Sequence, residues 1–185
     1  MSSALVVNVL DLLRRPGSEK SVSVVAKAEV FDFADSRIAN DSDVKVEIDL
    51  ESSSTGIVAQ GSATVGWVSV CRRCLRPVSG VADAEVHEAF SREVSAHRRG
   101  ADAAENLAVD GDAEPLVGDQ IDFTLPVREA VLLAVPDAPL CRPDCPGLCP
   151  QCGADLATTT CSCVNETRDE RWSALDALRG KLDEA

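Results

Sequence analysis

The residues of this sequence with the clearest capacity for chemistry are its eight cysteines, which fall into four close pairs. Four thiolates bind one Zn²⁺ tetrahedrally at about 2.3 Å, so eight paired cysteines suit two four-cysteine zinc sites. Two of the pairs have the CxxC spacing, in which a short turn presents both sulfurs to one ion. The pairs are Cys71 and Cys74, Cys141 and Cys145, Cys149 and Cys152, and Cys161 and Cys163.

Four pairs can form two sites in three ways, and loop length favours one of them. The favoured first site closes a loop of only eight residues and consists of Cys149, Cys152, Cys161 and Cys163. Gly153 can adopt the positive φ that closes such a turn. The favoured second site then joins two distant parts of the chain and consists of Cys71, Cys74, Cys141 and Cys145. The alternative is a tail-only site of Cys141, Cys145, Cys149 and Cys152, with the other two pairs left over.

Catalytic roles for these cysteines have little support in the sequence. Thioredoxin-like exchange at Cys71 and Cys74 would need a helix N-terminus to lower the thiol pKa, whereas the flanking residues predict strands. A catalytic zinc site keeps an open position and usually has His, Asp or Glu ligands, and the only histidines are His87 and His97. The sequence has no metalloprotease, nucleotide-binding or nucleophile-elbow motif. We therefore predict structural zinc, no catalytic residue and no small-molecule substrate.

The charge of the chain restricts its partners. The 31 acidic and 18 basic residues give a net charge of −13, and aromatic residues make up only 3%. This composition argues against nucleic-acid binding through bulk positive charge or through base stacking. Eleven acidic and three basic residues lie within 83–122. The only dense basic cluster lies in the first cysteine pair, and the candidate RNA-binding or partner-binding residues are Arg72, Arg73, Arg76, Arg142, Arg168 and Arg171.

The N-terminal residues do not resemble a secretion signal. No basic residue precedes the first apolar stretch, and Asn8 and Asp11 interrupt it. The sequence also has no run of about 20 apolar residues, which a membrane-spanning helix requires. We therefore expect a cytoplasmic protein without a membrane partner, in which paired thiols hold metal rather than form disulfides.

Alternation of apolar and polar residues predicts strands in the first half of the chain. Val44, Val46, Ile48 and Leu50 alternate with charged residues, as in a half-buried strand. Residues 4–10 and 21–33, two runs within 56–70, and residues 81–90 also indicate strands, and 77–80 indicates a turn. The predicted fold class is α+β, with an antiparallel β-sheet or partly open barrel over residues 1–96 that carries the first CxxC knuckle.

The second half of the chain changes in character. Residues 97–118 are polar and acidic, which predicts a flexible linker. Residues 119–185 are expected to form a short strand, a helix capped by Thr124, the cysteine-rich zinc-binding segment and a C-terminal helix. The first of these helices has an apolar stripe at Val127, Ala130, Val131 and Ala134, and the last begins with a capping box at 167–170.

Several of these segments together resemble the YceD family, the large ribosomal RNA subunit accumulation proteins. The similar segments are 71–75, 118–122, 127–136, 139–141, 145–153, the pair Cys161 and Cys163, and 169–172. The tail resembles Gram-positive and actinobacterial members of the family. The resemblance implies a ribosome biogenesis factor for accumulation or processing of large-subunit (23S) rRNA, without an established catalytic residue.

The leading hypothesis is a non-enzymatic factor whose zinc-stabilised surface recognises large-subunit rRNA or its precursor. The acidity of residues 83–122 makes an indirect route, through a basic ribosomal protein, a rival to direct contact. The alternative from another class is a zinc/thiol redox-responsive regulatory protein that releases metal on oxidation.

Overall fold

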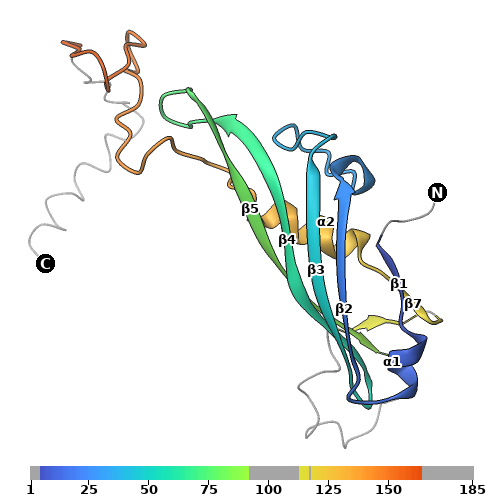
Figure 1. Ribbon diagram of the computed structural model, residues 1–185. Helices are drawn as coiled ribbons and strands as arrows, with labels where there is room; N and C mark the ends of the chain where they lie inside the picture. The colour runs from blue at the N-terminus through green and yellow to red at the C-terminus, as the bar shows by residue number, and fades with distance from the viewer. Residues whose placement is uncertain (1–4, 92–112, 117, 164–185) are drawn as a thin grey trace, which may run out of the picture.

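The computed structural model of the protein describes residues 5–91, 113–116 and 118–163 (Figure 1). Its larger sheet contains β2 (Glu19–Lys27), β3 (Asp43–Ser52), β4 (Gly56–Val70), β5 (Pro77–Ser91) and β6 (Glu114–Pro115), in that order. The pairs from β2 to β5 are antiparallel, and β6 is parallel to the end of β5. Because β2 to β5 follow one another in the chain, each pairs with its neighbour in sequence, as in a meander.

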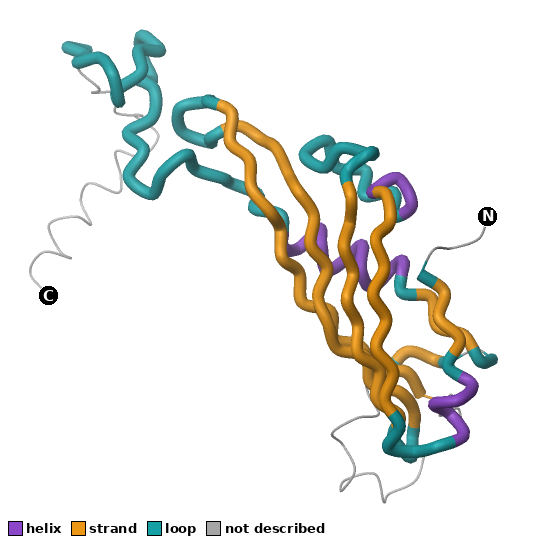
Figure 2. Tube along the Cα trace, in the orientation of Figure 1, coloured by secondary structure: helices purple, strands orange, loops and turns teal. Residues whose placement is uncertain are grey.

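A second, two-stranded sheet pairs β1 (Val6–Asn8) with β7 (Gln120–Asp122). In the described part of the chain the helices are α1 (Leu10–Arg14), the 3-10 helix η1 (Ala28–Val30) and α2 (Thr124–Ala134). Within the described residues after α2, which are 135–163, the chain continues without a helix or a named strand toward the tip of the β4–β5 hairpin (Figure 2). The described part of the chain is therefore α+β with a sheet that does not close, which confirms the predicted fold class.

The core lies on one face of the larger sheet. Every second residue of β3 is buried, and the buried apolar residues Val44, Val46, Ile48 and Leu50 are at most 2% exposed. The intervening residues are exposed on the opposite face, which we call the outer face. This period-two burial is the one that the sequence alternation predicts.

Helix α2 covers the core face and lies behind the sheet in Figure 1. Its residues Val127 and Val131 are fully buried, as expected from the apolar stripe in the sequence. Phe123, directly before α2, meets Phe90 of β5 edge to face, with 5.6 Å between ring centroids. These contacts fix α2 across the strands that carry the first cysteine pair.

Two predictions about the long hairpin are wrong. Residues 77–80 begin β5 rather than form a turn, because the turn lies at 71–76 and is closed by a hydrogen bond from the Cys71 N–H to the Arg76 carbonyl (2.7 Å). Residues 56–70 form one strand rather than two, with Gly61 and Gly66 inside it. A glycine in a strand can mark a close backbone approach instead of a strand end, and Gly61 does so here.

Other local predictions need smaller corrections. The chain turns into α1 at Leu10, because the Asn8 side-chain oxygen accepts a hydrogen bond from the Leu10 N–H (3.1 Å). The strand expected over 21–33 ends at Lys27, where η1 follows. Thr124 does not cap α2; instead the Asp122 carboxylate accepts hydrogen bonds from the Thr124 N–H (2.9 Å) and hydroxyl (2.6 Å).

Part of the expected linker belongs to the sheet, since β6 lies within 97–118 and pairs with Phe90 and Ser91. The helix predicted after residue 167 lies outside the described residues. No helix in the part of the chain that the structure describes is long and apolar enough to cross a membrane.

Gly61 provides a test of this packing. An alanine Cβ at Gly61 would lie 2.8 Å from the Ile48 Cα and closer still to the Glu47 carbonyl oxygen. Since backbone cannot move aside as a side chain can, we expect Gly61→Ala to lower the free energy of unfolding by about 1–3 kcal/mol in urea titrations. Gly66→Ala, in the same strand but with nothing within 4 Å of its Cβ, is the matched control and should change little. Equal losses for both variants would contradict this account.

Candidate metal centres

The first cysteine cluster joins the tip of the β4–β5 hairpin to the segment after α2. Its four Sγ atoms lie within 4.8 Å of one another, and they belong to Cys71, Cys74, Cys141 and Cys145. The Sγ atoms of Cys71 and Cys145 are 3.9 Å apart, and those of Cys74 and Cys141 are 3.6 Å apart. Four sulfurs at about 2.3 Å from a central ion lie about 3.8 Å from one another, so these distances suit a tetrahedral ion.

The second cluster is built within one short segment of the tail and consists of Cys149, Cys152, Cys161 and Cys163. The Cys161 Sγ lies 3.4 Å from the Sγ atoms of both Cys149 and Cys152. Gly153 has φ +71°, and its N–H donates to the Cys149 carbonyl (2.8 Å), which closes the turn. All eight cysteines are free thiols, and their grouping is the one that loop length favours in the sequence.

The hairpin turn positions the first pair through its own backbone. The Leu75 N–H donates to the Cys71 carbonyl (2.9 Å), and Leu75 has φ +59°, so the chain reverses directly after Cys74. The Arg72 N–H donates to the Pro139 carbonyl (2.9 Å), which brings the segment after α2 to the turn. This approach places Cys141 next to Cys74.

The two clusters differ in exposure. Cys71, Cys74 and Cys145 are at most 6% exposed and form a small buried group with the half-buried Val78 and Leu148. In the second cluster only Cys149 is buried, whereas Cys152 and Cys163 are exposed. The first cluster is therefore built into the fold, and the second lies near solvent.

Backbone amides favour the thiolate of one cysteine in each cluster. The N–H groups of Cys74 and then Cys141 lower the pKa of the Cys71 thiol to about 6. The N–H groups of Cys152 and then Gln151 lower the pKa of the Cys149 thiol to about 6. Because the thiolate is the form that binds metal, each cluster offers an ionised ligand at neutral pH.

The crowding of sulfurs has the opposite effect on a second cysteine of each cluster. Hydrogen bonding with the Cys145 thiol, followed by burial, raises the pKa of Cys141 to about 12. Hydrogen bonding with Cys161 and then Cys152 raises the pKa of Cys163 to about 12. Four thiolates cannot collect in so small a volume without a cation, so this arrangement suits a divalent ion.

Arginines of the hairpin turn connect the two clusters. The Arg73 carbonyl accepts a hydrogen bond from the Leu148 N–H (3.1 Å), and the Arg73 guanidinium donates to the Cys145 carbonyl (2.9 Å). Arg76 forms an ion pair with Asp155, which lies between the two halves of the second cluster. Gly147, with φ +80°, lets the tail pass so close to Arg73 that a Cβ there would lie 3.0 Å from the Arg73 carbonyl oxygen. The turn and the tail thus form one unit, which we call the cysteine unit (residues 71–76 and 139–163).

These contacts divide the candidate arginines into those that hold the cysteine unit together and those that do not. Arg73 and Arg76 hold the cysteine unit together, whereas the exposed Arg72 side chain has no hydrogen bond or ion pair with a described residue. Arg142 is exposed and lies 3.3 Å from the Asp144 carboxylate. Arg168 and Arg171 lie outside the described residues. The sequence does not predict Asp155 as a partner of Arg76, since 79 positions separate the two residues.

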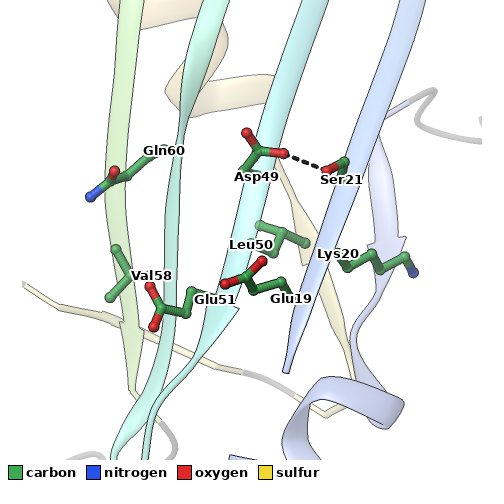
Figure 3. A pocket seen from close by; sticks show the side chains of 8 residues that line it. All are labelled: Glu19, Lys20, Ser21, Asp49, Leu50, Glu51, Val58 and Gln60. Carbon is green, nitrogen blue, oxygen red and sulfur yellow. Dashed lines mark hydrogen bonds between the residues drawn. The ribbon is translucent and has the colours of Figure 1, made fainter. Parts of the chain in front are cut away.

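The outer face of the sheet also carries acidic hollows, which were not predicted from the sequence. A hollow of about 400 Å³ there contains the carboxylates of Glu19, Asp49 and Glu51 (Figure 3). A neighbouring hollow of about 480 Å³ contains Asp83 and Glu85. The alternation of β3 was a sufficient signal, because it places every acidic residue of that strand on the outer face.

Among the described residues, the two cysteine clusters are the only groups of three or more potential metal ligands. The fold and these clusters define an α+β protein with an open, mostly antiparallel sheet and a cysteine unit at the tip of its longest hairpin. The family model described as "Large ribosomal RNA subunit accumulation protein YceD" matches residues 59–179. The chain therefore belongs to the YceD family.

Comparison with individual proteins agrees with this membership. An uncharacterized protein of Mycobacterium tuberculosis is 34% identical over 193 aligned positions, which cover 98% of this chain and 88% of that protein. An uncharacterized protein of Mycobacterium leprae is 30% identical over 162 positions, covering 83% of this chain and 68% of that protein. The Arabidopsis thaliana chloroplast protein named YCED homolog 1 is 31% identical over 65 positions, covering 35% and 20%. No solved structure matches the chain significantly.

Metal counting tests the two clusters. Elemental analysis of the purified reduced protein should find two divalent metal ions per chain. Cys71→Ser and Cys149→Ser should each bind one, because each substitution leaves only three thiolates in one cluster. Absence of metal from the wild-type protein, or loss of both ions on substitution of Cys149 alone, would contradict two separate sites.

Proposed function

We propose that this protein is a non-enzymatic ribosome biogenesis factor that acts in the cytoplasm and is needed for accumulation or processing of large-subunit (23S) rRNA. The observation that carries the proposal is the match of the YceD family model across residues 59–179, which include all eight cysteines. The name of the Arabidopsis relative, a large ribosomal RNA subunit accumulation protein, supports the same role.

The metal in this proposal is zinc, bound in two structural sites. All four donors of each cluster are thiols, and the sulfur separations of 3.4–3.9 Å suit a tetrahedral ion. A four-cysteine zinc site has no open position for water or substrate, so it stabilises structure rather than performs hydrolysis. Here zinc would hold the hairpin turn and the tail as one rigid surface.

Recognition of RNA would use this surface, and Arg72 is its best candidate contact. Arg72 projects from the same turn as Arg73 and Arg76, but those two residues are engaged by Cys145 and Asp155. The exposed Arg142 could add a second phosphate contact nearby. With so few cations on a chain of net charge −13, binding should be modest in affinity and sensitive to salt.

The acidic outer face supports a second version, in which a basic ribosomal protein is the direct partner. Three strands, β2, β3 and β5, present carboxylates on that face, among them Glu19, Glu47, Asp49 and Glu85. Such a surface could mask the positive charge of a ribosomal protein until rRNA competes for it. Binding of isolated precursor rRNA without any ribosomal protein would contradict this version.

The proposed function predicts a specific cellular defect. Depletion of the protein should lower the ratio of large-subunit to small-subunit rRNA, because the large subunit fails to accumulate. The wild-type gene should restore the ratio, and Cys71→Ser should restore it less, because the hairpin turn would lose its metal. The ratio can be measured by electrophoresis of total RNA. An unchanged ratio after depletion would refute the proposal.

Direct RNA contact predicts a distinct effect of Arg72. Arg72→Glu should weaken binding to a large-subunit rRNA fragment and reduce the slope of log affinity against log salt by about 1. The metal content should stay at the wild-type value, because Arg72 contributes only its backbone N–H to the cysteine unit. Lys45→Glu, the same charge change at an exposed position of β3, is the matched control. Equal weakening by both variants would indicate a general charge effect and contradict a contact at Arg72.

A further inference from the structure

The edge of the larger sheet formed by β2 is unpaired in the described part of the chain. β2 is the first strand in the sheet order, so it pairs with β3 on one side and with no described strand on the other. Its pairing with β3 runs without a bulge from Glu19 to Lys27, and it contains no proline. Proteins usually protect such a long straight edge with a bulge, a proline or a covering element, because an unpaired edge binds other strands.

The hydrogen-bond pattern identifies which residues of β2 face outward along this edge. At one end of the ladder the Ala28 N–H donates to the Ser42 carbonyl (2.9 Å), and at the other the Ser52 N–H donates to the Ser18 carbonyl (2.9 Å). Because bonded pairs alternate along an antiparallel ladder, the even-numbered residues of β2 bond to β3. The odd-numbered residues therefore direct their N–H and C=O groups away from the sheet.

The backbone groups at the centre of this edge have no partner among the described residues. No hydrogen bond from another described residue reaches the backbone of Ser21, Ser23 or Val25. Lys20, which might have blocked the edge, is held by a hydrogen bond from its ammonium group to the Asn8 carbonyl (2.7 Å). Val25 is 61% exposed.

The sequence of β2 is complementary to itself when two copies run antiparallel about Ser23. Ser23 then faces Ser23 of the second copy, and each odd-numbered residue faces another odd-numbered residue. These are the residues whose N–H and C=O groups point away from the sheet, so the two copies can form hydrogen bonds with each other. Glu19 faces Lys27 of the second copy at both ends of the pairing. Val22 faces Val24 of the second copy on the core side, where both residues are only half-buried in the single chain.

The charges at the ends of β2 also suit a second copy. Within one chain Glu19 lies directly opposite Glu51, and like charges in this position are unfavourable. Lys27 lies opposite Asp43 and binds its carboxylate at 2.5 Å. In the paired arrangement Lys27 of one copy lies between Asp43 of its own chain and Glu19 of the second copy. Opposite charges therefore alternate across the contact, which they do not do at Glu19 and Glu51 of the monomer.

We propose that this protein forms a two-fold symmetric dimer in which the β2 strands pair antiparallel about Ser23 and continue one sheet through both copies. The contact is isologous, as in most protein dimers, since each copy offers the same strand. The cysteine unit lies beyond the end of β4 and β5 that is level with Lys27. The two-fold axis therefore places the cysteine units of the dimer at opposite ends. This inference goes beyond the proposed function and does not depend on it.

Mass measurement with two variants at Ser23 tests the contact. At tens of micromolar, light scattering of the wild-type full chain should give a mass approaching twice the 19.6 kDa of one chain. Ser23→Pro should give a monomer, because it removes an N–H that only the second copy uses and places a ring at the two-fold axis. Ser23→Ala keeps the N–H and should stay dimeric. Circular dichroism and thermal unfolding establish that each variant is folded.

Charge reversal tests the register of the pairing. Glu19→Lys and Lys27→Glu should each raise the dimer Kd at least about fivefold, because two lysines or two glutamates then meet at both ends. An equimolar mixture of the two single variants should recover the wild-type Kd, since every pair in the mixed dimer joins opposite charges.

Three results would overturn the proposal. They are a wild-type monomer at every concentration, a dimer that a folded Ser23→Pro variant retains, and a mixture of the charge variants that associates no better than either one alone. Either of the first two results would show that the β2 edge is not the dimer contact. A wild-type monomer is also the result expected if another part of the same chain covers this edge. The third excludes the register. None of these results bears on accumulation of rRNA, so the proposed function stands or falls separately.

Discussion

The meeting of four thiols from two distant segments is the constraint on which the rest of the molecule depends. The sulfurs of Cys74 and Cys141 lie 3.6 Å apart although 67 positions separate them in the sequence. Closing so long a loop costs conformational entropy, and the binding free energy of a metal ion can offset this cost. The fold lowers this entropy cost further. The buried Val127 and Val131 fix α2 across the sheet, and the chain that follows α2 runs toward the tip of the hairpin.

The same constraint explains the length of the β4–β5 hairpin. The fifteen-residue strands β4 and β5 extend past the core, where Val68 and Val70 are half exposed or more. A shorter hairpin would end over the core and would leave Cys71 and Cys74 far from the segment after α2. Extension of the hairpin separates the arginine-containing turn at its tip from the acidic residues of the outer face.

The errors of the sequence predictions share a physical cause, which is that residue preferences act locally and pairing does not. Proline and glycine at 77–80 have turn preferences, but continuous pairing with β4 outweighs them. Thr124 is a good helix cap in isolation, but here it is the first residue of α2, and its N–H and hydroxyl donate to Asp122 of β7, a strand held by β1. Asp155 could not be found as a partner of Arg76, since nothing in the sequence brings their two segments together.

The sequence by itself determines the cysteine pairs, the strand alternation of β3, the apolar stripe of α2 and the division of the cysteines that loop length favours. These features depend on spacing over a few residues, and spacing is visible in the sequence. Only the tertiary structure decides that Arg73 and Arg76 bind the tail while Arg72 stays exposed, that the acidic residues of several strands share one face, and that β2 is an edge strand. Each of these depends on which segments are neighbours in space, and that is set by packing across the whole sheet.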